Sequence, residues 1–348
     1  MDGQLRDKVA SGVAWSMAEK VGTMLLQLAV SLTILRLLNP AIMGVIAIPT
    51  AFLAVAIVIA DSGFSQALIR KGTPTADDYK SVFAFNVGVA LVLYGVLVAL
   101  AGSIARFYDM PEITRIAPVF FLQLPLSAAC AIQNTIFVRT FRFALLSKVT
   151  FASWFIAGMV AIGLALAGFG IWCIVVQRVL QASVRALLLW WLSDWRPCGK
   201  CSVKPLREMA PFGCSLMVTD LISNFYNKIP QFFLGKLYSP AVLGSFDQAV
   251  KLKDMPAATG IQAVQNVTFP ALAKIRDDAP RFAEGYRQVV MVVSYVMFPI
   301  MLGMSAVARD MFAVLLGEEW MPTVPYFEAV CLAGLFSPIA LTAYNVLK

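Results

Sequence analysis

Long apolar segments alternate with short polar segments along the whole chain. Each apolar segment holds about 20 residues, which is the length that an α-helix needs to cross the hydrocarbon layer of a membrane. The pattern therefore predicts an all-α polytopic membrane protein. Its ten expected transmembrane spans are residues 13–35, 41–60, 82–104, 116–138, 149–168, 171–192, 212–236, 241–271, 288–308 and 325–347.

The first four predicted spans recur about 200 residues later. Residues 36–44 match residues 236–244 without a gap, so that Pro40 is matched by Pro240 and Gly44 by Gly244. Residues 107–111 match residues 318–322 at an offset of 211. Internal repeats in a polytopic membrane protein are typical of transporters, whose substrate path lies between the repeats. The repeat favours a carrier over an enzyme.

The repeat also predicts the domain organisation. We expect an N-terminal lobe of six helices over 1–195, a cytoplasmic linker over 196–210 and a C-terminal lobe of four helices over 211–348. An even number of spans in a lobe makes the repeats parallel, around a central cleft. Asn134 closes the fourth span, and its match Asn345 lies three residues from the end of the chain. We therefore expect a fragment that lacks at least two helices; the alternative is a natural protein of ten spans.

Composition and charge agree with a membrane protein. The chain is 59% hydrophobic and 14% charged, whereas soluble domains carry about 25% charged residues. Of the 28 lysines and arginines, the predicted inside segments hold 17 and the outside segments five when the N-terminus is inside. The positive-inside rule then places both ends in the cytoplasm. The net charge of +8 is thus a topology signal, and no nucleic-acid partner is predicted.

The sequence offers no catalytic constellation. Histidine is absent, which removes the commonest metal ligand and the usual proton switch near neutral pH. Cys198 and Cys201 form a single CxxC pair, whereas a zinc site needs about four ligands. The predicted outside loops are too short for a catalytic domain. We therefore predict that the protein is not an enzyme and has no cofactor and no metal site.

Polar residues inside the predicted spans follow helix faces. In the seventh span Asp220, Asn224, Asn227 and Gln231 have the spacing i, i+4, i+7, i+11, which is one side of a helix. The first span carries a similar stripe of Ser16, Lys20, Thr23, Gln27 and Ser31. At the offset of 200, Lys20 matches Asp220 and Gln27 matches Asn227. The stripes predict a shared central cavity; the alternative is polar contact between packed helices.

Charged residues within spans are functional candidates, because they are costly in a bilayer. The cations exceed the acids, which suits an anionic cargo such as a pyrophosphate. The candidate substrate-binding residues are Lys20, Gln27, Arg36, Arg178, Asn224, Asn227, Lys228, Lys236 and Lys251. For Arg36 and Lys236, anchoring at the membrane interface is an equal alternative. Asp61, Asp220 and Asp247 are the candidates for coupling to a proton or Na⁺, since a desolvated carboxylate can titrate near neutral pH.

An ordered set of short motifs resembles the Wzx-type polysaccharide and lipopolysaccharide flippases. These form the colanic-acid exporter-like branch of the multidrug/oligosaccharidyl-lipid/polysaccharide exporter superfamily. The most specific motif covers residues 234–244. Others lie at 11–16, 35–40, 61–68, 104–108, 168–172, 195–197, 269–272 and 316–322.

The resemblance implies a two-lobed helical fold in the bacterial inner membrane that works by alternating access. It implies a cargo of undecaprenyl-pyrophosphate-linked oligosaccharide, moved from the cytoplasmic to the outer leaflet with energy from an ion gradient. Polysaccharide polymerase machinery is the implied protein partner. Many relatives carry an acid near the position of Pro230, so Asp220 or Asp61 would replace it here. The alternatives are a multidrug or cation antiporter, a peptidoglycan-precursor flippase, or a membrane-bound polymerase or ligase.

Overall fold

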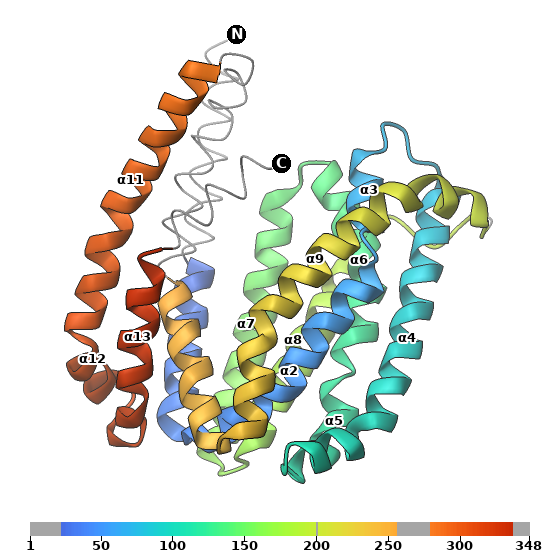
Figure 1. Cartoon of the computed structure of the whole chain (residues 1–348). Helices are drawn as coiled ribbons and strands as arrows, with labels where there is room; N and C mark the ends of the chain where they lie inside the picture. Colours follow the sequence, from blue (N-terminus) through green and yellow to red (C-terminus); the bar gives the residue numbers. More distant parts are fainter. Residues whose placement is uncertain (1–21, 200, 256–278, 337–348) are drawn as a thin grey trace. The chain divides into compact units, whose positions relative to one another are not determined.

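The computed structural model describes residues 22–199, 201–255 and 279–336, and in these residues every regular element is helical (Figure 1). A helix over Gly22–Leu37 comes first. The labelled elements follow as α2 (Pro40–Asp61), α3 (Phe64–Arg70), α4 (Ala76–Phe107), α5 (Glu112–Phe120), α6 (Gln123–Arg139), α7 (Phe143–Leu166), α8 (Ile171–Leu192), α9 (Val203–Leu237), α11 (Ala279–Ala306), α12 (Ala308–Leu315), the 3₁₀ helix η1 (Glu318–Thr323) and α13 (Val324–Gly334). A further helix begins at Pro240 and is described to residue 255.

Six helical segments of the described chain are long and apolar enough to cross a membrane. They are Pro40–Asp61, Ala76–Phe107, Glu112–Arg139, Phe143–Leu166, Ile171–Leu192 and Glu284–Ala306. The prediction of an all-α polytopic membrane protein is therefore confirmed, whereas the count of ten spans stays a prediction. Parts of the first, eighth and tenth predicted spans lie outside the described residues.

The predicted span 116–138 is two helices, α5 and α6, with a turn at Phe121 and Leu122. Pro125 explains the interruption. A proline has no N–H to donate to the carbonyl four residues earlier, and its ring clashes with that carbonyl. For Pro125 the residue concerned is Phe121, so a continuous helix is strained at this point.

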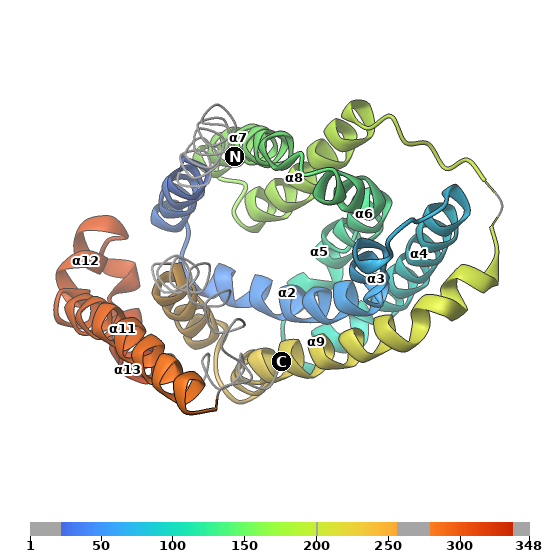
Figure 2. The ribbon, with the colours of Figure 1, turned by 90° about the horizontal axis from the view of Figure 1, so that it is seen from above.

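The chain forms two compact units, of which the first comprises residues 1–38 and 45–239. Within it α7 packs against α8, α6 lies between α4 and α8, and α9 runs along α3 and α4 (Figures 1 and 2). A core cluster of Phe64, Leu68, Val82, Ile132 and Met209 joins α3, α4, α6 and α9.

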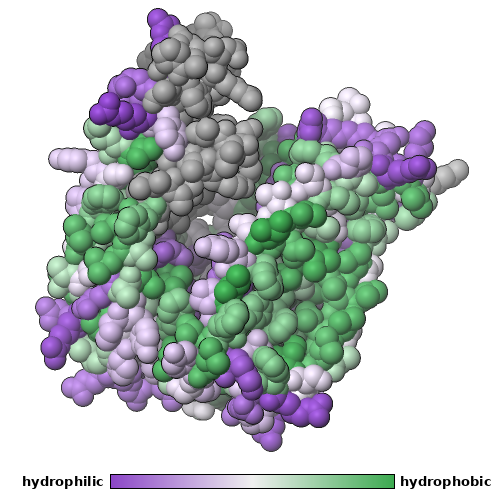
Figure 3. All heavy atoms as spheres, in the orientation of Figure 1, coloured by the Kyte–Doolittle hydropathy of each residue, from purple (hydrophilic) through white to green (hydrophobic). Residues whose placement is uncertain are grey.

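Large apolar side chains remain exposed on the outer helix faces of this unit. Leu91, Val92 and Val96 on α4 and Phe155 and Met159 on α7 are examples. Figure 3 shows one face of the molecule, where hydrophobic residues cover the middle of the helices and hydrophilic residues gather toward their ends. Exposed apolar surface with polar ends is the arrangement expected for helices in lipid.

Charged side chains hold the loop between α3 and α4 against α6 and α9. Arg139, at the end of α6, donates to the carbonyl oxygens of Ile69, Lys71 and Gly72 at 2.6–3.0 Å. Lys71 forms ion pairs with Asp78 at 2.9 Å and with Glu208 at 3.5 Å. The hydrogen bond to Asp78 is the main cause that raises the pKa of Lys71 above its usual value. These contacts fix the start of α4 beside the start of α9.

The second compact unit comprises residues 39–44 and 240–348. Here α11 lies alongside α13, and α12 and η1 pack at one end of α13 (Figure 1). The first turn of α2 meets the first turn of the helix that begins at Pro240. A Cβ atom on Gly44 would overlap the carbonyl oxygen of Pro240, and one on Gly244 would overlap that of Pro40. The contact is reciprocal between residues that the sequence repeat matches.

Candidate functional site

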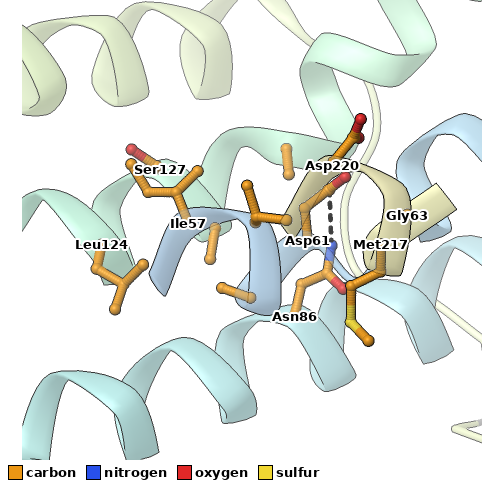
Figure 4. Close-up of a pocket in the computed structure, with 12 residues that line it drawn as sticks. Ile57, Asp61, Gly63, Asn86, Leu124, Ser127, Met217 and Asp220 are labelled. Atoms are coloured by element: carbon orange, nitrogen blue, oxygen red, sulfur yellow. Dashed lines mark hydrogen bonds between the residues drawn. The ribbon is translucent and has the colours of Figure 1, made fainter. Parts of the chain in front are cut away.

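A pocket of about 270 Å³ lies within the first unit, between α2, α4, α6 and α9. Most of its wall is apolar, from side chains such as Ile57, Leu124 and Met217. Its polar lining consists of Asp61, Asn86, Ser127 and Asp220. Figure 4 shows Asp61, Asn86 and Asp220 gathered at one end of the pocket, whereas Ser127 lies toward the other end near Leu124.

Asp61 owes its place to a break in the chain direction. It is the last residue of α2, and the next two residues, Ser62 and Gly63, have φ angles of 48° and 68°. Positive φ is unfavourable for most residues and easy for glycine. After this turn α3 begins at Phe64, which brings the Ser65 hydroxyl to donate a hydrogen bond to Oδ1 of Asp61.

The same turn lets α9 come close. A Cβ atom on Gly63 would overlap the carbonyl oxygen of Gly213, which lies about two turns before Asp220 on α9. The Arg70 guanidinium lies 4.5 Å from the ring centroid of Phe212 and adds a second contact between α3 and α9. The close approach at Gly63 and the cation–π contact of Arg70 thus hold α9 so that Asp220 lines the same pocket as Asp61.

Asn86 and Ser127 are polar residues of this pocket that the sequence patterns missed, and Asn86 is the one in contact with Asp61. Asn86 lies about three turns into α4, is fully buried, and points its Nδ2 toward Oδ1 of Asp61 at 3.5 Å. Its own Oδ1 is buried without a hydrogen-bond donor among the described residues. An intramembrane asparagine is itself a functional signal, but Asn86 stands alone in an apolar segment and belongs to no polar stripe.

The electrostatic balance of the pocket is negative. Among the described residues, neither Asp61 nor Asp220 forms an ion pair with a lysine or arginine. The Asp61 carboxylate, which is half-buried in a mostly apolar setting, attracts positive charge more strongly than it would in water, and the exposed Asp220 adds a second negative charge nearby. The arrangement is suited to binding a small cation or a proton.

Two candidates that were predicted separately, Asp247 and Lys251, form an ion pair on the helix that begins at Pro240. Lys251 Nζ lies 2.5 Å from Oδ2 of Asp247, whose side chain is only 6% exposed, compared with 43% for the lysine. The two residues are one helical turn apart. The Lys251 side chain remains partly exposed beside this pair.

Other predicted cations have partners of their own. Lys236 donates to the carbonyl oxygen of Phe107 at 2.7 Å, lies 3.6 Å from Asp109, and sits 4.9 Å from the Phe107 ring centroid. The half-buried Arg178 has its guanidinium 5.9 Å from the ring centroid of Trp154. The roles of Lys236 and Arg178 stay predictions.

The remaining candidates lie on described helices, with one exception. Lys20 lies outside the described residues. Gln27 is half-buried and Arg36 exposed on the helix Gly22–Leu37, and on α9 Asn227 is exposed and Lys228 half-buried. Asn224 donates to the backbone oxygen of Asp220 at 2.9 Å. None of these contacts tests a role in substrate binding, which stays a prediction.

The described fold, with six helical segments long and apolar enough to cross a membrane, is that of a polytopic membrane protein. One solved structure with a similar fold is a lipid II flippase, MurJ, in an inward closed conformation. The TM-score is 0.75 at 12% sequence identity, and the alignment covers 97% of this chain and 76% of that one. At this identity the likeness shows the fold.

The chain belongs to the family described as polysaccharide biosynthesis protein, which matches residues 33–325. It is 24% identical over 331 residues to the succinoglycan biosynthesis transport protein ExoT of Rhizobium meliloti (strain 1021), covering 95% of this chain and 67% of that protein. It is 22% identical over 351 residues to the lipopolysaccharide biosynthesis protein WzxC of Escherichia coli (strain K12), covering 96% and 68%. The resemblance inferred from the motifs is confirmed.

Proposed function

We propose that this protein is a flippase that moves lipid-linked oligosaccharide from the cytoplasmic to the outer leaflet of the bacterial inner membrane. The cargo would be an undecaprenyl-pyrophosphate-linked repeat unit of a surface polysaccharide. The membership of the polysaccharide biosynthesis family carries this proposal. The fold shared with a lipid II flippase and the name of a relative as a biosynthesis transport protein support it.

The mechanism follows from the chemistry of the cargo. A pyrophosphate carries negative charge that cannot cross hydrocarbon without compensation, and Lys or Arg in a partly wet cavity supplies it. Lys228, Lys251 and Arg178 are the cations proposed to hold the diphosphate, together with Lys20, and Gln27, Asn224 and Asn227 would bind the polar groups. The two lobes, over 1–195 and 211–348, would alternate in exposing this site.

Energy would come from an ion gradient, with a proton or Na⁺ entering through the acids Asp61 and Asp220 or through Asp247. The protein would have its N-terminus in the cytoplasm, perform no covalent chemistry on its cargo, and deliver it to polymerase machinery. The pocket around Asp61 supports the coupling proposal, because its carboxylates lack cationic partners among the described residues.

The test is complementation of a bacterium that lacks its own polysaccharide flippase. We expect the wild-type protein, expressed from its complete gene, to restore surface polysaccharide, and Lys228→Ala in the same protein to lower it about fivefold or more, because a charged hydrogen bond to the diphosphate contributes at least about 1 kcal/mol. The readout is surface polysaccharide per cell, normalised to the amount of the protein in the membrane.

Lys204→Ala is the matched control, because Lys204 is an exposed lysine in the first turn of the same helix, α9. We expect it to export at the wild-type level. Export that is unchanged in Lys228→Ala and reduced in Lys204→Ala would remove Lys228 from the site. A folded wild-type protein that restores no polysaccharide in any recipient strain would contradict the assignment of lipid-linked oligosaccharide as the cargo.

A further inference from the structure

One face of α7 carries a single cation at the start of an exposed apolar strip. We use the name α7 strip for Ala144, Lys148, Phe151, Phe155 and Met159, all of which are exposed. Their spacing of i, i+4, i+7, i+11 and i+15 keeps them on one side of the helix. The rings of Phe151 and Phe155 stack with centroids 6.3 Å apart and planes 10° apart, so they form a flat apolar wall.

The α7 strip lies on the side of the helix that does not pack against the protein. The buried residues Val149, Ser153 and Ala157 occupy the opposite side of α7. There Val149 belongs to a core cluster with Ala186 and Leu189 of α8, the helix against which α7 packs (Figure 2). The strip is therefore open to the lipid of the membrane.

The turn that leads into α7 places a phenylalanine where helices usually place a glycine. The N–H of Phe141 donates to the carbonyl oxygen of Val138 at 3.1 Å, and the N–H of Arg142 donates to that of Phe137 at 2.9 Å. These are the two hydrogen bonds of a Schellman motif, in which the residue at the position of Phe141 has a positive φ, here 56°. A positive φ costs free energy for a bulky side chain.

Few contacts within the chain offset this cost. Phe141 is 80% exposed, and its ring meets that of Phe143, which is itself exposed. The chain thus holds an aromatic ring outward against its own backbone preference. Strain of this kind is typical of residues that act on a partner outside the folded chain.

The charges beside these rings favour an anionic partner. Arg142 and Lys148 are exposed, and neither forms an ion pair among the described residues. Arg139, at the end of α6, holds the turn in place through its hydrogen bonds to the end of α3. The positive-inside rule predicts that this turn is cytoplasmic, and the cytoplasmic leaflet carries the anionic lipids that attract such cations.

The length of the α7 strip matches one leaflet. From Lys148 to Met159 the helix rises about 16 Å, close to half of the roughly 30 Å thickness of the hydrocarbon layer. A lysine at the headgroup level with apolar side chains along one leaflet is complementary to a lipid with an anionic headgroup and straight acyl chains. A folded protein partner in the cytoplasm would not reach the deeper part of this strip.

We propose that the α7 strip and the turn before it bind an anionic phospholipid of the surrounding membrane. Arg142 and Lys148 bind its phosphate, because the long lysine stem lets the ammonium reach the headgroup level. One acyl chain lies on the stacked rings of Phe151 and Phe155, and the ring of Phe141 lies among the headgroups. This binding does not rest on the proposed function.

The experiment measures lipid binding by the purified full-length protein in detergent. The probe is radiolabelled phosphatidylglycerol, and phosphatidylcholine with the same acyl chains is the comparison lipid without net charge. We expect saturable binding of phosphatidylglycerol with an affinity about tenfold or more above that for phosphatidylcholine, because two basic side chains face the headgroup. Thermal unfolding of each variant is measured alongside.

Lys148→Gln and Phe141→Gly are the informative variants. Lys148→Gln should weaken phosphatidylglycerol binding about fivefold and leave phosphatidylcholine binding unchanged. Phe141→Gly should weaken phosphatidylglycerol binding about threefold or more and yet raise the unfolding midpoint by about 2 °C, because glycine adopts a positive φ without strain. A phenylalanine with a purely structural role would instead lower the midpoint when it is lost.

Lys204→Gln is the matched control. Lys204 is an exposed lysine in the first turn of α9, but the residue one turn further on is the charged Glu208, so no apolar strip follows it. This variant should bind phosphatidylglycerol as the wild type does.

Three outcomes would overturn the proposal. The first is equal binding of the two phospholipids by the folded wild type, and the second is unchanged phosphatidylglycerol binding by Lys148→Gln. The third is displacement of phosphatidylglycerol by a much lower concentration of a polyprenyl diphosphate, which would assign the strip to the cargo. The site and the proposed function fail separately, because a protein that moves no cargo can still bind the phospholipid.

Discussion

At the residue scale, the charged groups of the described membrane helices differ in how their charge is compensated. Asp247 is buried and has Lys251 one turn away, whereas Asp61 and Asp220 face a pocket without a lysine or arginine partner among the described residues. Removing one partner of a buried ion pair is strongly unfavourable, because the other charge stays buried. We therefore expect the loss of the Asp247 ion pair to change the stability of the fold, and substitution of Asp61 or Asp220 to change ion binding.

This contrast predicts the behaviour of the Asp247–Lys251 pair. Lys251→Ala should lower the free energy of unfolding by about 1–3 kcal/mol, because it removes the cationic partner of a largely buried carboxylate. Adding Asp247→Asn should recover most of that loss, since the buried charge is then gone. Thermal unfolding of the purified protein in detergent measures both effects.

Lys253→Ala is the control for this pair. Lys253 lies 2.7 Å from Asp254, but that carboxylate is 56% exposed and remains hydrated when the lysine is removed. Its loss should cost no more than about 1 kcal/mol. If Lys251→Ala and Lys253→Ala are equally mild, or if Asp247→Asn deepens the loss, the ion pair does not stabilise the fold in the way described.

Sequence reasoning at this scale identified single residues and not their groupings. Asp61 and Asp220 stood out because acids inside apolar segments are costly, yet nothing in the sequence placed them at one pocket. That meeting depends on the left-handed turn at Ser62 and Gly63 and on the close passage of Gly213. Asn86 was missed because an isolated polar residue has no periodicity to detect.

At the element scale, helix caps and prolines determine where the observed helices differ from the spans that hydropathy predicts. α4 begins at Ala76, six residues before the predicted span, because Thr75 and Asp78 form a reciprocal capping box. The turn between α5 and α6 interrupts a continuous apolar segment beside Pro125. Hydropathy finds the membrane-crossing stretch in both cases, but caps and prolines set the helix bounds.

The glycine contact between matching turns of the repeat gives an element-scale prediction. Gly44→Ala and Gly244→Ala should each destabilise the second unit by about 1–3 kcal/mol, because the new methyl group would overlap the backbone carbonyl of Pro240 or Pro40. The two losses should not add, since separating the turns for one methyl group makes room for the other. Unfolding midpoints of the single and double variants measure this.

Gly88→Ala is the matched control for these variants. Gly88 lies inside α4, and a Cβ atom there would meet nothing within 4 Å. Alanine is favoured over glycine in a helix by about 1 kcal/mol, so this variant should be neutral or more stable than the wild type. Equal stability of Gly44→Ala and Gly88→Ala would mean that the turns do not pack as closely as described.

At the scale of the whole molecule, the sequence predicted the class of fold and the family more fully than the site. Apolar segments of membrane length dictate helices, since only helices and closed barrels satisfy the backbone in lipid. The ordered motifs then identified the polysaccharide biosynthesis family, which matches residues 33–325. The central cavity between lobes and the positions of the cargo cations stay predictions, because they depend on how distant segments pack.

The most direct test of the account is transport by the full chain reconstituted in lipid vesicles with a fluorescent lipid-linked oligosaccharide. A membrane-impermeant quencher reports how much cargo has crossed to the outer leaflet. The account predicts cargo movement that depends on the protein, leaves the cargo chemically unchanged, and slows about fivefold or more in Lys228→Ala but not in Lys204→Ala. Folded protein that moves no more cargo than protein-free vesicles, or that returns the cargo chemically altered, would contradict it.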